Sequence, residues 1–187
     1  MRMKAKKPLL LIALAVSLLA LLVMTWAGSA LAAPSPLDNH HSAVVSGSVE
    51  YVGWVFGPST YDKGGYSYWP GNMLTWKLHG DLEGTYTQTL TYISPLSNPA
   101  AYVIEGSAMF TGTILGVNTT WTACVHGAGL LDVSDPANHP FKGKDFWTST
   151  LTGSVTPAHM RGSIFIAGTY DYGVSPDHYT YAGLLVW

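Results

Sequence analysis

The chain has 187 residues, of which 48% are hydrophobic and 11% are charged, so a disordered polypeptide is excluded. This length fits a single domain with its own core. Beyond residue 32 there are 5 basic and 11 acidic residues, a net charge of −6, which argues against a nucleic-acid partner.

Residues 1–32 have the organisation of a signal peptide. Basic residues near the start are followed by an apolar run from Leu9 to Ala27, and then by Ala30 and Ala32 at the −3 and −1 positions of a signal-peptidase site. We therefore expect an exported protein, secreted or periplasmic, whose mature chain begins at Ala33. The alternative is that the apolar run stays uncleaved as a membrane anchor with the domain outside, and membrane contact is expected only in that case.

Residues 33–43 are rich in Pro, Ser, Asn and His and are expected to be a linker before a domain of residues 44–187. The domain consists of segments with a two-residue period, separated by Gly, Pro, Asn and Asp. In the clearest segment, Leu82–Ile93, threonines alternate with large side chains, which is typical of a half-buried strand. The predicted strands are Val44–Phe56, Met73–His79, Leu82–Ile93, Ala101–Leu115, Val117–Leu131, Asp145–Thr156, Met160–Tyr170 and Tyr179–Trp187.

These strands and the short connections between them predict an all-β fold, an antiparallel up-and-down barrel of about eight strands, with an open β-sandwich as the alternative. The period also predicts the side chains that face the interior: Leu82, Tyr86, Leu90, Trp147, Leu151, Val155, Ile164 and Ile166. Glycine precedes Ser or Thr at seven places in these strands. We expect bends and bulges of a closed barrel at those glycines.

Three short runs carry a family resemblance: Gly80–Thr85, Tyr102–Gly106 and Phe110–Thr113. With the alternating threonines around them, they resemble small bacterial proteins grouped with the allene oxide cyclase-like barrels, over about residues 73–170. The resemblance implies a calycin-type barrel and an isomerase or cyclase activity. It assigns no catalytic residue in this chain.

Metal and nucleophile chemistry find little support in the sequence. His40 and His41 are adjacent in the linker and the other histidines lie singly, so neither a metal site nor a cofactor is predicted. Cys124 is the single cysteine and is expected to be a small buried side chain. Glu83 and Glu105 share a face with threonines and are expected to be exposed, so the catalytic residues stay unknown.

Aromatic residues give the best indication of function. The segment 57–72 is predicted to be a long loop at the barrel mouth, and rings in such a loop are suited to cover a ligand. We predict that a small molecule binds at a mouth formed by Tyr66, Tyr68 and Trp69, above the inward side chains of Tyr86, Gln88 and Tyr92. Buried Gln88 then needs a hydrogen-bond partner.

The sequence thus predicts an exported barrel that binds a small apolar or partly polar molecule in its lumen without catalysis. Two alternatives stay open. One is an isomerase or cyclase of the allene oxide cyclase-like type, and the other is a surface protein that binds carbohydrate through the same rings.

We expect N-terminal sequencing of the protein recovered from the culture medium or the periplasm to begin at Ala33. The physical reason is that Pro34 directly after the scissile bond would obstruct cleavage one residue later. An intact Met1 in the membrane fraction would support the anchor instead.

Overall fold

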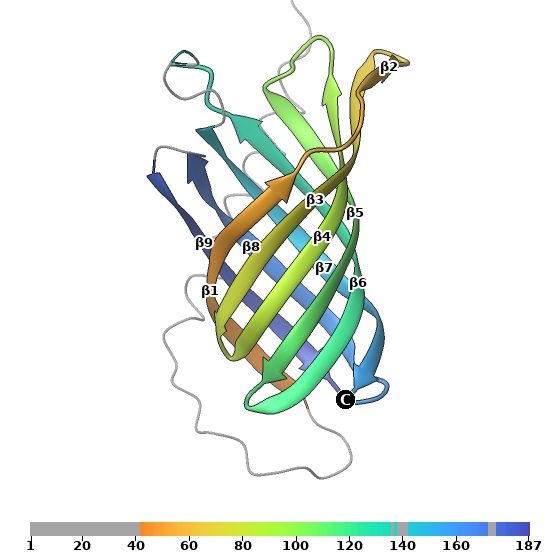
Figure 1. Ribbon diagram of the computed structural model, residues 1–187, viewed down its shortest axis with the longest axis vertical. Coiled ribbons are helices and arrows are strands. Elements are labelled where there is room, and N and C mark those ends of the chain that lie inside the picture. Colours follow the sequence, from red (N-terminus) through yellow and green to blue (C-terminus); the bar gives the residue numbers. More distant parts are fainter. Residues whose placement is uncertain (1–41, 136, 138–141, 172–174) are drawn as a thin grey trace, which may run out of the picture. The chain divides into compact units, whose positions relative to one another are not determined.

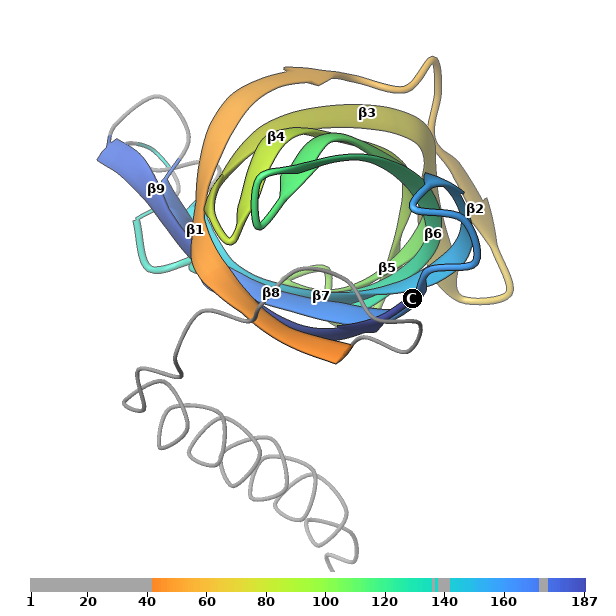
Figure 2. The same ribbon diagram turned by 90° about the horizontal axis from the view of Figure 1, so that it is seen from below.

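The computed structural model of the protein describes residues 42–135, 137, 142–171 and 175–187. The described residues form an antiparallel barrel of eight strands with one short additional strand (Figures 1 and 2). The sheet closes because β1 pairs with β9 on one side and with β3 on the other. The predicted barrel is therefore confirmed and the open sandwich is wrong. The predicted signal peptide and most of the linker lie outside the described residues.

The strands follow one another around the barrel in chain order, so each pairs with its neighbours in sequence, β2 being added at the outer edge of β3. Their bounds are β1 Ser42–Val55, β2 Tyr61–Lys63, β3 Tyr66–Gly80, β4 Leu82–Pro95, β5 Ala101–Ile114, β6 Val117–Leu131, β7 Lys142–Thr156, β8 Arg161–Asp171 and β9 Ser175–Val186. Among the described residues no helix is long and apolar enough to cross a membrane.

The predicted loop 57–72 is partly wrong, because β2 and the first part of β3 form a hairpin there. Gly64 and Gly65 make its turn, and both have the positive φ that a two-residue hairpin turn requires. The hairpin projects beside the β4–β5 turn, and we call this end of the barrel the upper end (Figure 1). The lower end carries the β3–β4 and β5–β6 turns.

Burial follows the predicted period along most strands. Seven of the eight predicted interior side chains are buried, namely Leu82, Tyr86, Leu90, Trp147, Leu151, Ile164 and Ile166. The prediction for Val155 is wrong, because its side chain is 74% exposed. Two register irregularities between β6 and β7 shift the period there, so that Ser154 pairs with Trp121 and Val155 faces outward.

Cys124 is exposed, so its prediction as a buried side chain is wrong. Its neighbours Ala123 and Val125 are buried, and the alternation of β6 turns Cys124 to the outer face. There it lies opposite Ser107 of β5 and Thr150 of β7.

Most strand glycines do not mark bulges. Of the seven glycines expected to do so, only Gly153 lies at a register irregularity. The others face the lumen in regular register, where a larger side chain has no room. A Cβ atom on Gly168 would lie 2.5 Å from the ring of Tyr179, and one on Gly127 would lie 2.3 Å from the carbonyl oxygen of Phe146. Gly168 and Gly127 thus leave room for the side chains of Tyr179 and Trp147 on the neighbouring strands, which lie against the inner face of the barrel at these positions.

We expect Gly127→Ala to lower the free energy of unfolding by about 1–3 kcal/mol, because the added methyl group overpacks against the backbone and against Trp147. Urea unfolding measures this change. Gly53→Ala is the matched control, because a Cβ atom there meets nothing within 4 Å, and we expect it to leave stability unchanged or slightly raised. Equal effects of the two substitutions would contradict the packing role of Gly127.

Candidate functional site

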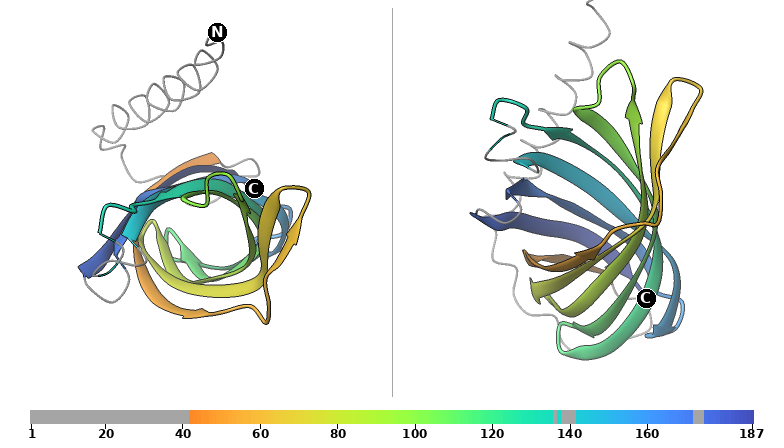
Figure 3. Two further views of the ribbon diagram at one scale, coloured as in Figure 1. Left: turned by 90° about the horizontal axis from the view of Figure 1, so that it is seen from above. Right: turned by 45° about the horizontal axis from the view of Figure 1, so that its top comes forward.

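Large side chains occupy the middle and lower parts of the lumen. The rings of Trp76 and Trp147 lie 5.4 Å apart, and those of Phe110 and Trp121 stack at 5.2 Å. These four residues are at most 2% exposed. This part of the barrel interior is therefore a packed core, which an eight-stranded barrel is just wide enough to hold. Figure 3 shows the ring of strands around it from above.

Gln88 and Tyr86 belong to this packed middle part. The Oε1 atom of Gln88 accepts a 2.7 Å hydrogen bond from the indole of Trp76, and its Nε2 atom donates to the Tyr86 hydroxyl at 3.4 Å. The Tyr86 hydroxyl is also hydrogen-bonded to Ser149. Burial raises the pKa of Tyr86 to about 12, against the opposing effect of these hydrogen bonds. Protein side chains thus supply the partner that buried Gln88 requires.

A second polar group lies nearer the upper end, and we call it the tyrosine–aspartate cluster: Tyr102 of β5, Asp145 of β7, Tyr170 of β8 and Tyr179 of β9. Tyr102 donates to Oδ2 of Asp145 at 2.9 Å, and Tyr179 donates to Oδ1 at 2.6 Å. The hydroxyls of Tyr102 and Tyr170 are 2.9 Å apart. Since the single hydrogen of Tyr102 is used on Asp145, Tyr170 is the donor in this bond.

Glycines on the neighbouring strands make room for the cluster. Gly129 and Gly168 lie beside Asp145 in register, on β6 and β8. A Cβ atom on Gly129 would fall 2.2 Å from the ring of Tyr102 and 2.7 Å from the Cβ atom of Asp145. The cluster therefore depends on a glycine at this position.

The cluster is nearly excluded from solvent, with Asp145 9% exposed and Tyr170 5%. Burial raises the pKa of Tyr102 far above its ordinary value, and the charge of Asp145 raises it further. The pKa of Tyr92 is raised well above its ordinary value by the same two causes, burial being the larger. Both phenols consequently keep their hydrogens at physiological pH.

Partly buried rings surround the cluster on the side of β1 and β4. Tyr92 lies 5.5 Å from Tyr102 at a steep angle of 63°, and Trp54 lies 5.7 Å from Tyr92. Tyr51 meets Trp76 edge to face at 5.5 Å. We call Tyr51, Trp54 and Tyr92 the aromatic wall. The aromatic wall therefore adjoins the tyrosine–aspartate cluster through the contact of Tyr92 with Tyr102.

The remaining predicted mouth residues lie on the hairpin and do not form one group. Tyr66 is 45% exposed, and Tyr68 stacks on Tyr61 at 5.1 Å. Trp69, 39% exposed, pairs with Tyr92 across β3 and β4, and strand alternation puts it on the face opposite to Tyr68. Of the six predicted site residues, the structure therefore brings Trp69 next to Tyr92 and sets Tyr66 and Tyr68 apart.

The residues of the cluster were not singled out by sequence reasoning. A signal was present, because Asp145 shares its strand face with Trp147 and Leu151, and Tyr102 shares its face with Ile104. The period alone places each of these side chains inward. The two-residue period gives no information on which strands lie next to one another, so it could not predict that the four residues meet.

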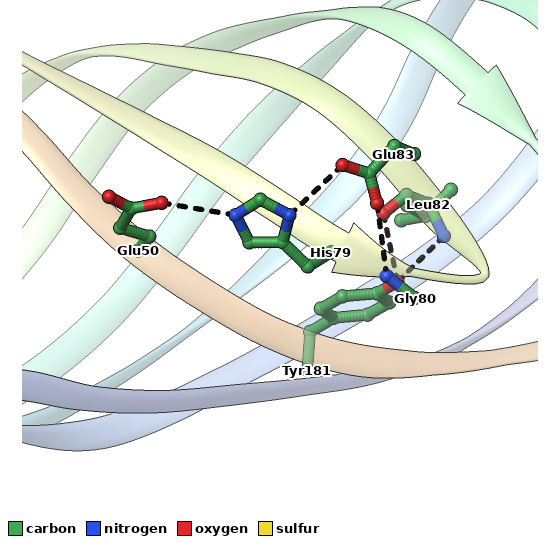
Figure 4. A network of polar contacts seen from close by, with 6 residues as sticks. All are labelled: Glu50, His79, Gly80, Leu82, Glu83 and Tyr181. Atoms are coloured by element: carbon green, nitrogen blue, oxygen red, sulfur yellow. Dashed lines mark hydrogen bonds and ion pairs between the residues drawn. The ribbon is translucent and has the colours of Figure 1, made fainter.

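A separate polar network lies on the outer surface at the lower end, as Figure 4 shows. His79 contacts Glu50 through Nε2 at 3.1 Å and Glu83 through Nδ1 at 2.9 Å, which links β1, β3 and β4. Nearby, Leu82 N donates to the Tyr181 hydroxyl at 2.7 Å. No group of three or more His, Cys, Asp or Glu side chains in the described ranges is placed to hold a metal ion.

The hydrogen bonds to Glu50 and Glu83, in that order, raise the pKa of His79 above its ordinary value of 6.5. The stabilisation from protonated His79 is thus fully present below pH 6.5 and is lost as the pH rises through the raised pKa. We expect Glu50→Gln to lower the His79 pKa in an NMR titration. Glu105→Gln, which removes an exposed carboxylate on β5, is the control and leaves the titration unchanged. An unaltered pKa in Glu50→Gln would contradict the pairing.

Comparison with known proteins adds no relative: no protein-family model matches the chain, and no curated protein matches it.

Proposed function

We propose that this protein is an exported, non-catalytic β-barrel that binds a small, partly polar molecule at the upper end of its lumen. The apolar part of the molecule packs against the aromatic wall, and its polar group bonds to the tyrosine–aspartate cluster. The organisation of residues 1–32 supports export, since a basic start, an apolar run and small residues at a cleavage site occur there together.

The buried carboxylate of Asp145 carries the proposal. Taking a carboxylate out of water costs several kcal/mol, and apolar residues in its place commonly leave a protein as stable or more stable. Stability alone therefore does not account for the buried carboxylate of Asp145. Buried ionisable groups held in a specific polar environment are concentrated at functional sites.

The position of the cluster also favours binding. It lies near the ends of strands β5, β7 and β8, directly above the packed rings of Trp76 and Trp147, which Tyr179 contacts at 5.1 and 5.4 Å. Ligands enter small barrels at such ends, where a few polar groups converge within an apolar surround. A molecule in solvent can contact the aromatic wall, because Tyr51, Trp54 and Tyr92 are only partly buried.

Two probes of one shape test the proposal: 3,3-dimethylbutan-1-ol, which is neutral, and choline, which is cationic. We expect at least one of them to bind saturably and to shift the NMR signals of Tyr92 and Tyr102. The signals of Phe110 and Trp121, in the lower lumen, stay in place because those rings pack against each other. Absence of saturable binding by both probes would contradict the proposed function.

A pair of variants locates the bound probe. Tyr92→Leu removes a ring of the aromatic wall and is expected to weaken binding about tenfold, equivalent to about 1.4 kcal/mol. Tyr61→Leu removes a ring from the hairpin, where it contacts Tyr68, and is expected to leave binding unchanged. The reverse result would place the ligand on the hairpin, as the carbohydrate-binding alternative requires.

A further inference from the structure

We infer that Asn72 is a positioning residue for the ligand site: its buried side-chain amide, anchored at the base of the β2–β3 hairpin, holds the ring of Trp54 in the orientation that the ligand meets. The inference rests on the proposed function and adds a residue that acts on the ligand through Trp54. Three observations lead to it: a bulge in β3, the hydrogen bonds of the amide and the partial burial of the aromatic wall.

A β-bulge in β3 turns Asn72 toward the lumen. The pairs that Trp69 and Asn72 make with β4 leave two residues between them on β3 and one residue on β4. The two residues on β3 are Pro70, which has no N–H to donate, and Gly71, whose φ of 72° favours glycine. The bulge therefore places Trp69 and Asn72 on the same face of the sheet, where Asn72 is 3% exposed.

The side-chain amide of Asn72 joins three separate points of the upper end. Its Oδ1 atom accepts hydrogen bonds from the indole of Trp54 at 3.1 Å and from the backbone N–H of Gly57 at 3.3 Å. Its Nδ2 atom donates to the carbonyl oxygen of Trp69 at 2.6 Å. Because one end of the amide accepts and the other donates, these bonds select a single orientation of the side chain.

The backbone around Asn72 is closely packed and gives the amide a fixed anchor. A Cβ atom on Gly57 would lie 1.8 Å from the carbonyl oxygen of Pro70, so the segment after β1 lies directly against the bulge. Glycine at position 57 permits this approach, which brings the N–H of Gly57 within reach of Asn72. The amide is thus held at the base of the hairpin before it bonds to Trp54.

The ring of Trp54 lacks the complete packing of a core residue. It stacks on Phe56 at 4.6 Å and meets Tyr92 at 5.7 Å, but Trp54 and Tyr92 are only partly buried and Phe56 is 60% exposed. Close packing on all sides fixes the rotamer of a core side chain, and a partly exposed ring has less of it. The hydrogen bond to Asn72 supplies the constraint that packing leaves out.

Gln88 shows the difference between this position and the core. Its amide also accepts a hydrogen bond from an indole, that of Trp76, but Trp76 is 1% exposed and is surrounded by other rings. The ring that Asn72 holds is instead part of the aromatic wall. A contact residue that is held in place before binding lowers the entropy that the ligand must remove, so the affinity rises.

Calorimetric titration with choline and with 3,3-dimethylbutan-1-ol tests the inference. Asn72→Leu keeps a branched side chain without hydrogen bonds, and we expect about three- to tenfold weaker binding of each probe that binds the unmodified protein. Thr119→Val is the matched control, because it removes a buried hydroxyl that bonds to the Val117 carbonyl oxygen at the lower end, and it leaves the affinity unchanged. Unchanged affinity in a folded Asn72→Leu protein, or equal losses in both variants, overturns the inference and leaves the proposed function standing.

A double-mutant cycle distinguishes positioning from a general effect on structure. Because Asn72 acts through Trp54, we expect Asn72→Leu to change the affinity less than about twofold in a protein that already carries Trp54→Leu. Additive losses in the double variant overturn the inference, since they mean that Asn72 affects binding independently of Trp54.

An NMR titration of the unmodified protein decides the question if the variants do not fold. Saturation with the bound probe is expected to shift the indole N–H signal of Trp54 and the side-chain amide signals of Asn72, while the indole N–H signal of Trp121 in the packed core stays in place. Saturable binding without a shift at Trp54 and Asn72 overturns the inference alone. Absence of saturable binding by both probes overturns the proposed function and the inference together.

Discussion

The narrow interior of a closed eight-stranded barrel is the constraint on which this structure depends. One row of large rings fills the lumen, since Trp76, Tyr86, Phe110 and Trp121 lie opposite one another on β3 to β6. Elsewhere glycine stands beside a large ring and leaves room for it, as Gly127 does beside Trp147. Room for these rings is the reason for inward glycines such as Gly127, Gly129 and Gly168, despite the cost of glycine in strands. Aromatic rings that lie over glycine bury a large apolar area in a small volume. The core can therefore stabilise the barrel without a disulfide.

The lumen is mainly apolar in its middle and lower parts and contains a polar cluster near its upper end. In the lower and middle parts, tryptophan and phenylalanine rings pack closely, and the indole N–H group of Trp121 is buried without a hydrogen-bond partner among the described residues. A group of this kind costs about 1–3 kcal/mol. The burial of the large rings themselves offsets this cost. Near the upper end, by contrast, Asp145 and its tyrosines form bonds of good geometry, which is the condition under which a buried carboxylate persists.

The two-residue period predicted the barrel, its eight long strands and nearly all of the tested interior residues, because one buried face per strand determines the side to which each residue points. It failed at Val155, where bulges against β6 reverse the alternation without any change in the sequence pattern. The glycines within the strands were predicted to produce bends and bulges. In the structure, inward glycines such as Gly168 instead leave space for a ring on the neighbouring strand. The cluster of Asp145, Tyr102, Tyr170 and Tyr179 escaped prediction because its members are far apart in the chain and meet only when the barrel closes.

Closure of the sheet has a consequence for association with other chains. An open sheet ends in strands whose unpaired N–H and C=O groups recruit other chains and lead to aggregation. In the described part of this protein, β1 pairs with β9 from Ser42 to Val49, and the short strand β2 pairs with β3 alone. It is three residues long and carries Asp62 and Lys63. Charged residues on so short an edge discourage pairing with another chain, so the tyrosine-rich hairpin offers little backbone edge for aggregation.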